Sequence, residues 1–452
     1  MQFGARIVGR LWAGGLALLW LGACLPAAVP MATQPPSSQT DDRGGAIHNI
    51  AAAQPEATPT PEEATAPPVT PTPAGTTLRL WWPEPLAPVE NEDAADLLSE
   101  LIGAFRAANP DVMVDFRLKQ VDQVGMSNVG SLLATLRSAS AVAPGALPHV
   151  TLMRRSDLLE AASLGLLQPL RIPAAISGDM QRTALELGRI GEQVYGLPYM
   201  LEVEHMAFTE MALPPARWAF DDVLASSLTY VFPAGRVNAL SNAFLAQYLT
   251  AGPDLLVGGE LIVDAAVLRT VYTFYEQAVA AGVIDASVLE YLRPEDYGPA
   301  LLSGLVDAGI VTSTMYGKLQ ARGLALGFGL IPTTTGEAIT VLDGWMWVIT
   351  TPDISLQAVA LRFIEHMMQI SEHEAYARAV RMVPAQRTAL RGAVDPDYAA
   401  FVDNLVSLAV LPLAEGASGA VARAMQSGLA SVIAGQRTAD EATRDVIAQL
   451  SG

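Results

Sequence analysis

The stretch from Gly191 to Phe208 constrains the fold most, because it combines a tight turn with a long extended run. Gly191 and Gly196 allow backbone angles that other residues avoid, which favours a turn at the start. Pro198 lacks an amide hydrogen and favours an extended residue before it, so it fits the start or edge of a strand. The residues up to Phe208 therefore predict a strand that leaves one lobe and enters another. A buried hairpin without a ligand is the alternative.

Composition indicates a large folded protein and argues against two kinds of partner. The chain has 452 residues, 51% of them hydrophobic, which at about 150 residues per domain suggests two or three domains. The formal charge of -19, without a run of Lys or Arg, would repel a nucleic-acid backbone. We expect no metal and no cofactor, because Cys24 is the only cysteine and no two histidines are spaced as ligands on one helix turn. The five histidines are His48, His149, His205, His366 and His373.

The amino terminus has the pattern of a secretory signal peptide. Arg6 and Arg10 precede an apolar run over 11–21 that is short for a membrane span. The sequence Leu21-Gly22-Ala23-Cys24 resembles the lipobox of bacterial lipoproteins, in which the cysteine is diacylated. This resemblance predicts a signal peptide over 1–23, lipidation of Cys24, and export to the outer face of the cytoplasmic membrane. An ordinary secretory signal with an incidental cysteine is the alternative.

A segment rich in Pro, Ala, Thr, Ser and Gln follows, over 24–76. It cannot bury enough apolar surface to offset the entropy lost on ordering, so we expect a disordered tether. The tether would hold a folded domain clear of the membrane.

The folded part begins with a βαβ pattern. Apolar strands are predicted at 78–83 and 112–118, with a helix over 94–107 between them, and a further buried strand at 150–153. Ligands of such sheets bind beyond the carboxyl ends of the strands. Six residues are placed there by this rule: Trp81, Trp82, Glu84, Arg154, Arg155 and Ser156.

Several weak motifs occur in one order along the chain: Gly191 to Pro198, Gly304 to Thr312, Asp343 to Trp345, and the closing helix with its Thr438–Glu441 capping box. Together they resemble the extracellular solute-binding proteins of the maltodextrin-binding type, family 1, over about residues 78–450. The resemblance implies an α/β, two-lobed, periplasmic-binding-protein-like fold (type II) with three hinge crossovers, at Pro198, Pro332 and Pro384. The N-terminal lobe would comprise 77–204 and 328–368, and the C-terminal lobe 205–327 and 369–452.

The resemblance also implies ligand contacts at Tyr199, Glu202, Tyr316, Trp345 and Trp347, in addition to the strand-end residues. Burial of both tryptophans in the core is the alternative. Glu202, Glu204 and His205 could suggest a catalytic or metal cluster, but a solvated strand edge explains them better.

Three departures from the family pattern affect the expected ligand. His149 stands where the family often has Asp, Arg154-Arg155 is more basic than a plain sugar site needs, and Ala420-Val421-Ala422 lacks the aromatic platform of maltodextrin binders. A malto-oligosaccharide is therefore less favoured than another solute.

The resemblance implies a monomeric binding protein, not an enzyme, that captures a small solute, a carbohydrate, between its lobes and delivers it to the permease subunits of an ABC transporter. A lipoprotein of the same fold that reports to a membrane sensor is the alternative. A secreted glycosidase is a more distant one.

Overall fold

The computed structural model describes residues 75–87, 91–122, 130–209, 217–236, 239–413 and 419–451. The predictions for the signal peptide, Cys24 and the tether as far as residue 74 lie outside these ranges. The predicted βαβ unit is present: β1 (Thr76–Pro83) and β2 (Val112–Lys119) are parallel and joined by α1 (Glu92–Ala108). The Asn91 side chain caps α1 by accepting a hydrogen bond from the Ala94 amide at 3.1 Å.

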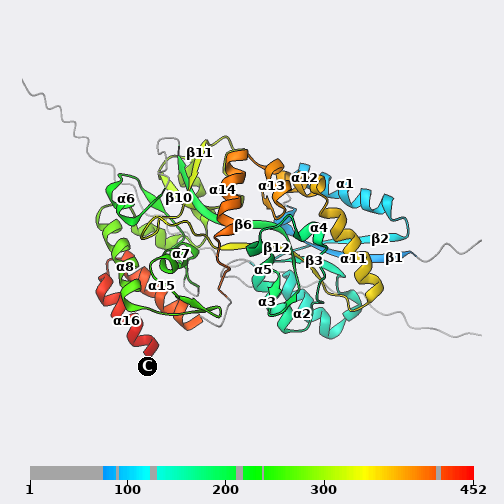
Figure 1. Cartoon of the computed structure of the whole chain (residues 1–452), viewed down its shortest axis with the longest axis horizontal. Helices are drawn as coiled ribbons and strands as arrows, with labels where there is room; N and C mark the ends of the chain where they lie inside the picture. Colours follow the sequence, from blue (N-terminus) through cyan, green and yellow to red (C-terminus); the bar gives the residue numbers. More distant parts are fainter. Residues whose placement is uncertain are drawn as a thin grey trace, which may run out of the picture. The chain divides into compact units, whose positions relative to one another are not determined.

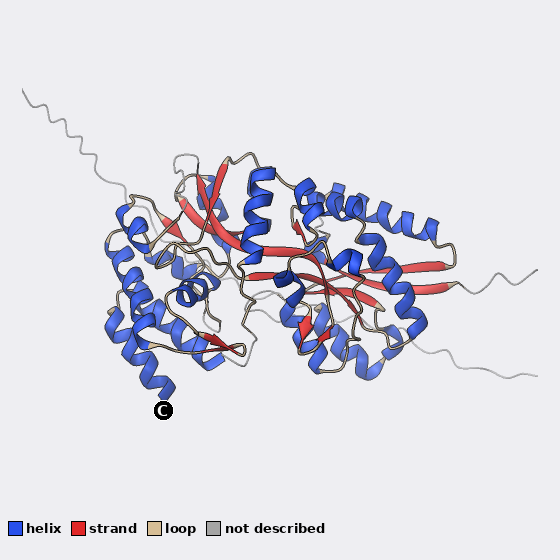
Figure 2. Cartoon of the chain, viewed as in Figure 1, coloured by secondary structure: helices blue, strands red, loops and turns tan. Residues whose placement is uncertain are grey.

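The first lobe is built on strands in the order β2, β1, β3, β12 and β6. The bounds of the last three are β3 (Val150–Met153), β12 (Leu342–Ile349) and β6 (Leu197–Thr209). β3 is parallel to β1, whereas β12 is antiparallel to both β3 and β6. Helices lie on both sides of these strands (Figure 2): α1, α11 (Ile354–Met367), α12 (Ile370–Val380), α2 (Leu132–Val142) and α3 (Arg155–Ser163).

Strand β6, labelled in Figure 1, belongs to both lobes. Its residues 197–203 pair with β12, and its residues 204–208 pair with β10 (Ala308–Thr312). The pairing changes between Val203, opposite Leu342, and Glu204, opposite Thr312. The first crossover therefore lies inside one continuous strand.

The second lobe continues the sheet through β10 and β7 (Tyr230–Val231), while β11 (Leu326–Gly329) pairs with the end of β6. Its helices include α6 (Phe220–Ala225), α7 (Asn242–Thr250), α8 (Ala265–Ala280), α9 (Gly298–Leu302), α10 (Ser313–Ala321), α15 (Gly419–Ile433) and α16 (Ala439–Ser451). The predicted capping box begins α16: the Thr438 amide donates to Glu441 Oε2 at 3.0 Å, and the Glu441 amide donates to Thr438 Oγ1 at 3.3 Å.

The remaining elements complete the described fold. They are α4 (Ala174–Ser177), α5 (Arg182–Glu186), β4 (Arg189–Ile190), β5 (Gln193–Val194), β8 (Leu256–Val257), β9 (Glu260–Leu261), β13 (Val383–Pro384), α13 (Arg387–Ala393), α14 (Pro396–Ser407) and the 3₁₀ turns η1 (Glu84–Leu86), η2 (Pro144–Ala146), η3 (Ala286–Glu290) and η4 (Pro294–Tyr297).

Three segments meet where the chain passes between the lobes. Thr340 Oγ1 accepts a hydrogen bond from the Glu204 amide at 3.0 Å and donates to the Glu204 carbonyl at 2.7 Å. The Val410 amide donates to the Thr340 carbonyl at 2.9 Å, and the Leu342 amide donates to the Val410 carbonyl at 2.9 Å. The second crossing thus approaches β6 at Thr340, and the third passes beside it at Val410. The prediction of the third crossing at Pro384 is wrong, because Pro384 pairs with Met200 inside the first lobe.

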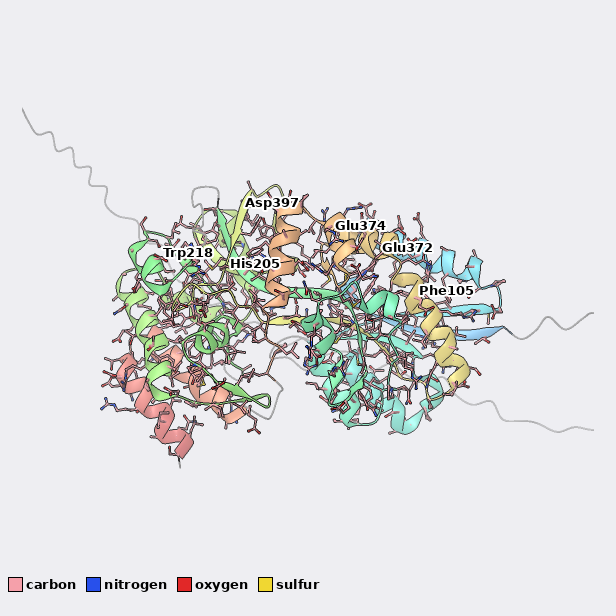
Figure 3. All side chains as sticks on the ribbon, viewed as in Figure 1. Phe105, His205, Trp218, Glu372, Glu374 and Asp397 are labelled. Atoms are coloured by element: carbon pink, nitrogen blue, oxygen red, sulfur yellow. The ribbon has the colours of Figure 1, made fainter. Side chains whose placement is uncertain are left out.

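Helix α12 lies beyond the predicted end of the first lobe at 368, yet its contacts are with that lobe. The Asn91 side chain donates to the Ala379 carbonyl at 2.8 Å, and Tyr376 OH donates to the Leu86 carbonyl. Figure 3 labels Phe105 on α1 and Glu372 on the neighbouring α12. We propose that the first lobe continues through α12 and β13.

Candidate functional site

A charged group connects the two adjoining strands β6 and β12 at the hinge. Arg154 follows β3 directly, and its guanidinium donates to Glu202 Oε2 at 2.9 Å and to Asp343 Oδ2 at 3.2 Å. The two carboxylates are neighbours because Asp343 of β12 is paired with Glu202 of β6. The guanidinium carbon also lies 5.1 Å from the ring centroid of Trp345, within the range of a cation–π contact. We call Arg154, Glu202, Asp343 and Trp345 the hinge cluster.

The hinge cluster is partly open to solvent. The side chains of Arg154, Asp343 and Glu202 are 36%, 28% and 12% exposed. Burial opposes the charge of Arg154, but the attraction of Glu202 and Asp343 outweighs it and raises the pKa of Arg154. Burial, against a smaller opposing effect of Arg154, raises the pKa of the nearby Asp157 to about 6. The cluster therefore offers a fixed cation and several acceptor oxygens at a partly exposed position.

Glu204 adds a carboxylate on the second-lobe side. Its side chain is buried, with the residue 5% exposed, and Asn242 Nδ2 donates to Glu204 Oε1 at 2.8 Å. The other oxygen, Oε2, has no hydrogen-bond partner among the described residues. Burial raises the pKa of Glu204, while Arg236 and the hydrogen bond from Asn242 act in the opposite direction. Such a buried acceptor without a partner is costly unless something else supplies a donor.

Three of the predicted contact aromatics lie in the core of the first lobe. Trp82, Tyr199 and Trp347 are each 0% exposed. Their ring centroids are 5.0 to 6.4 Å apart, and the Tyr199 ring is stacked on His373 at 4.8 Å. This aromatic packing leaves no ring face to which a ligand has access, so we leave these three out of the proposed site. Trp345 is 1% exposed, with Arg154 over its ring.

The remaining strand-end predictions, apart from Arg154, have contacts outside the hinge cluster. Trp81 is 3% exposed, with Lys119 Nζ 4.2 Å from its ring centroid. Glu84 begins the turn η1. Arg155 donates to the backbone carbonyls of Glu186 and Leu187, which anchors α3 and uses the guanidinium structurally. Ser156 is exposed, and its Oγ contacts Asp157 at 3.5 Å.

Tyr316, the predicted second-lobe contact, lies in a second aromatic group. It is 1% exposed and stacked on Tyr398 of α14 at 4.5 Å, and its hydroxyl donates to the Leu326 carbonyl. His205 joins this group through a 2.8 Å hydrogen bond between its Nε2 and Tyr398 OH. Figure 3 labels His205 on β6 and Asp397 near the start of α14. Tyr316 therefore packs α14 against the second lobe, while Gln181 of the first lobe donates to Asp403 of the same helix at 2.8 Å.

The expectation of a solvated strand edge at 202–205 is wrong. β6 is an internal strand, with His205 0% and Glu204 5% exposed. Sequence reasoning left Asp343, Glu204 and Asn242 out of the site. Spacing along the strands could have identified two of them. Asp343 precedes the predicted Trp345 by two residues, and Glu204 follows Glu202 by two, so each pair lies on one side of its strand. Nothing in the sequence links Asn242 to Glu204.

Within the described ranges, no group of three or more His, Cys, Asp or Glu is placed to hold a metal ion. In the same ranges, no helix is both long and apolar enough to cross a membrane.

Comparison with solved structures gives the fold its class. The sugar-binding protein MalE of Xanthomonas citri is 17% identical with a TM-score of 0.65, covering 82% of this chain and 95% of its own. The cyclic alpha-maltosyl-1,6-maltose binding protein of Arthrobacter globiformis is 15% identical with a TM-score of 0.65, covering 83% and 98%. The acarbose-binding GacH receptor of Streptomyces glaucescens is 18% identical with a TM-score of 0.60, covering 82% and 96%.

These similarities confirm the predicted two-lobed, periplasmic-binding-protein-like α/β fold. Within that class, this chain has the fold of the maltose- and maltodextrin-binding proteins. No protein-family model matches the chain, and no curated protein matches it.

Proposed function

We propose that this protein is an extracytoplasmic solute-binding protein that captures a carbohydrate at the hinge cluster, between its two lobes, and does not catalyse its conversion. The observation that carries the proposal is the partly exposed Arg154–Glu202–Asp343 group beside the strand shared by both lobes. Carboxylates and a guanidinium accept from and donate to hydroxyl groups, and a site at a hinge lets a ligand favour one arrangement of the lobes. The similar structures that bind sugars support this choice of ligand class.

We further propose that the protein is anchored by a lipid at Cys24 on the outer face of the cytoplasmic membrane and passes its solute, as a monomer, to ABC transporter permease subunits. The lipobox pattern at 21–24 supports the anchor. Mass spectrometry of the mature protein should find a diacylated Cys24, and Cys24→Ala should leave unprocessed precursor. An unmodified mature protein that begins elsewhere would refute the anchor.

Calorimetry with a panel of sugars and polyols tests the binding role. At least one sugar should bind the wild-type protein, and Glu202→Gln, which removes a charged partner of Arg154, should weaken that binding by about tenfold or more. Glu160→Gln, in the exposed pair with Arg137, is a matched control that should bind normally. If no sugar or polyol binds, the proposal is wrong. Turnover of chromogenic glycosides would instead indicate a glycosidase, and co-purification with a membrane kinase rather than a permease would favour the sensor role.

A further inference from the structure

The second lobe needs its own contact with the solute, because a ligand shifts the balance between two lobe arrangements only through its different affinity for them. Tyr316 does not supply this contact in the structure, since it is buried against Tyr398. Glu204 is placed to supply it. It is the first residue of β6 that pairs with the second lobe, and it lies two residues after Glu202, on the same side of the strand.

Two neighbours of Glu202, one opposite it on β12 and one further along β6, have an acceptor oxygen without a partner among the described residues. Among the described residues, Asp343 Oδ1 of the first lobe and Glu204 Oε2 of the second are buried and have no hydrogen-bond partner. Asn242 orients Glu204 through a hydrogen bond to its other carboxylate oxygen, and Thr340 orients it through two hydrogen bonds with its backbone. The carboxylate is thus held in one place with one oxygen left for an incoming donor.

The surroundings of Glu204 indicate the kind of donor. Tyr230 of β7 is 1% exposed, and its hydroxyl also has no partner among the described residues. Burial and, to a smaller extent, the charges of neighbouring groups that include Glu204 raise the pKa of Tyr230, so this hydroxyl lies near Glu204. A hydroxyl group can donate to Glu204 while accepting from the Tyr230 hydroxyl, whereas an ammonium group can only donate. A carboxylate or phosphate would be repelled by Glu204. A neutral polyhydroxylated group therefore fits this environment best.

We propose that Glu204 is the specificity-determining residue of the second lobe, and that its Oε2 accepts a hydrogen bond from a hydroxyl group of the solute. This inference rests on the proposed function, because it takes the solute to be bound at the hinge. Asp343 and Glu204 then contact one solute from two lobes.

The test is calorimetry on the full chain with glucose, maltose and sorbitol, and with deoxy analogues of whichever of these binds best. Glu204→Gln keeps the side-chain length and can still accept from Asn242, but it places a donor amide where Oε2 was. We expect at least a tenfold weaker binding of the parent compound by this variant. One deoxy analogue should bind wild-type protein at least tenfold more weakly than the parent, but should bind Glu204→Gln as well as the parent does.

Glu260→Gln, an exposed change on β9, is the control and should behave as wild type. Circular dichroism checks that both variants are folded, and the deoxy series on wild-type protein gives a readout if Glu204→Gln does not fold. Equal binding of the parent by wild type and Glu204→Gln overturns the inference alone. Failure of wild type to bind any of the panel overturns the proposed function as well. Tighter binding of glucosamine than of glucose that is lost in Glu204→Gln would show an ammonium partner and overturn the assignment to a hydroxyl.

Discussion

Glu202 and Glu204 lie on the same side of β6, yet they are bound by different lobes: Arg154 of the first lobe donates to Glu202 at 2.9 Å, and Asn242 of the second donates to Glu204 at 2.8 Å. Between them, the Val203 amide donates to Ser313 Oγ at 3.3 Å. A change in the angle between the lobes must therefore bend the strand between two carboxylates whose partners move separately. This relationship connects the hinge to the proposed binding site.

Arg154 should matter for stability more than other paired arginines. Arg154→Gln leaves Glu202 and Asp343 facing each other without a cation, which we expect to destabilise the fold by about 1–3 kcal/mol, after allowance for the partial exposure of the pair. Arg137→Gln removes an exposed pair with Glu160 and should cost within about 0.5 kcal/mol. Urea denaturation of both variants measures the difference. Equal small losses would mean that the hinge cluster contributes no more than a surface pair.

Two buried tryptophans should respond differently to replacement by phenylalanine. Trp82→Phe removes volume from the aromatic core and should lower stability by about 1–3 kcal/mol with unchanged ligand affinity. Trp345→Phe should also weaken sugar binding, because the Trp345 ring supports the guanidinium of Arg154. Thermal denaturation and calorimetry separate the two effects. Unchanged affinity in a folded Trp345→Phe protein would assign Trp345 to the core.

The hydrogen bond between Tyr398 and His205 should hold α14 against strand β6. Tyr398→Phe leaves a buried imidazole nitrogen without its partner and should cost about 1–3 kcal/mol. Tyr195→Phe removes an exposed hydrogen bond to Gln193 and is the matched control, with little change expected. Unfolding in guanidinium chloride measures the stability of both variants. If Tyr398→Phe is as stable as wild type, ring packing alone holds the helix.

Acid should destabilise the protein through His205 and His373. Burial lowers the pKa of each to about 4, against an ordinary value of 6.5. Between these pH values the unfolded chain binds protons that the folded chain does not, so stability falls as pH falls from about 6.5 to 4, by up to about 3 kcal/mol per histidine. Urea denaturation at pH 7 and pH 4.5 should show a smaller loss for His205→Gln than for wild type. An equal loss would contradict the assigned role of His205.

Local patterns predicted the fold well, because they depend on neighbouring residues. The first βαβ unit and the capping box of α16 follow from apolar spacing and from Thr438 with Glu441. The site was harder, because it depends on register between distant strands. Arg154 meets Glu202 and Asp343 only because β12 pairs with β6. Spacing likewise identified aromatic positions but could not separate a ring in the core, such as Trp82, from one that faces a ligand.

Closure of the lobes around a solute is the central claim, and distance measurement by double electron–electron resonance tests it most directly. Cys24 is the only native cysteine, so Cys24→Ser allows spin labels at Ser138→Cys on α2 and Ser303→Cys after α9, both exposed and in different lobes. Labels at Ser138→Cys and Ser99→Cys, both in the first lobe, provide the control pair.

Saturation with a sugar that binds by calorimetry should shift the distance distribution between lobes to a new maximum and leave the control distribution in place, because the lobes move as rigid bodies. Glu204→Gln should reduce the fraction of molecules that shift at a given sugar concentration. If a sugar binds tightly and the distribution between lobes stays the same, ligand-driven closure is wrong for this protein.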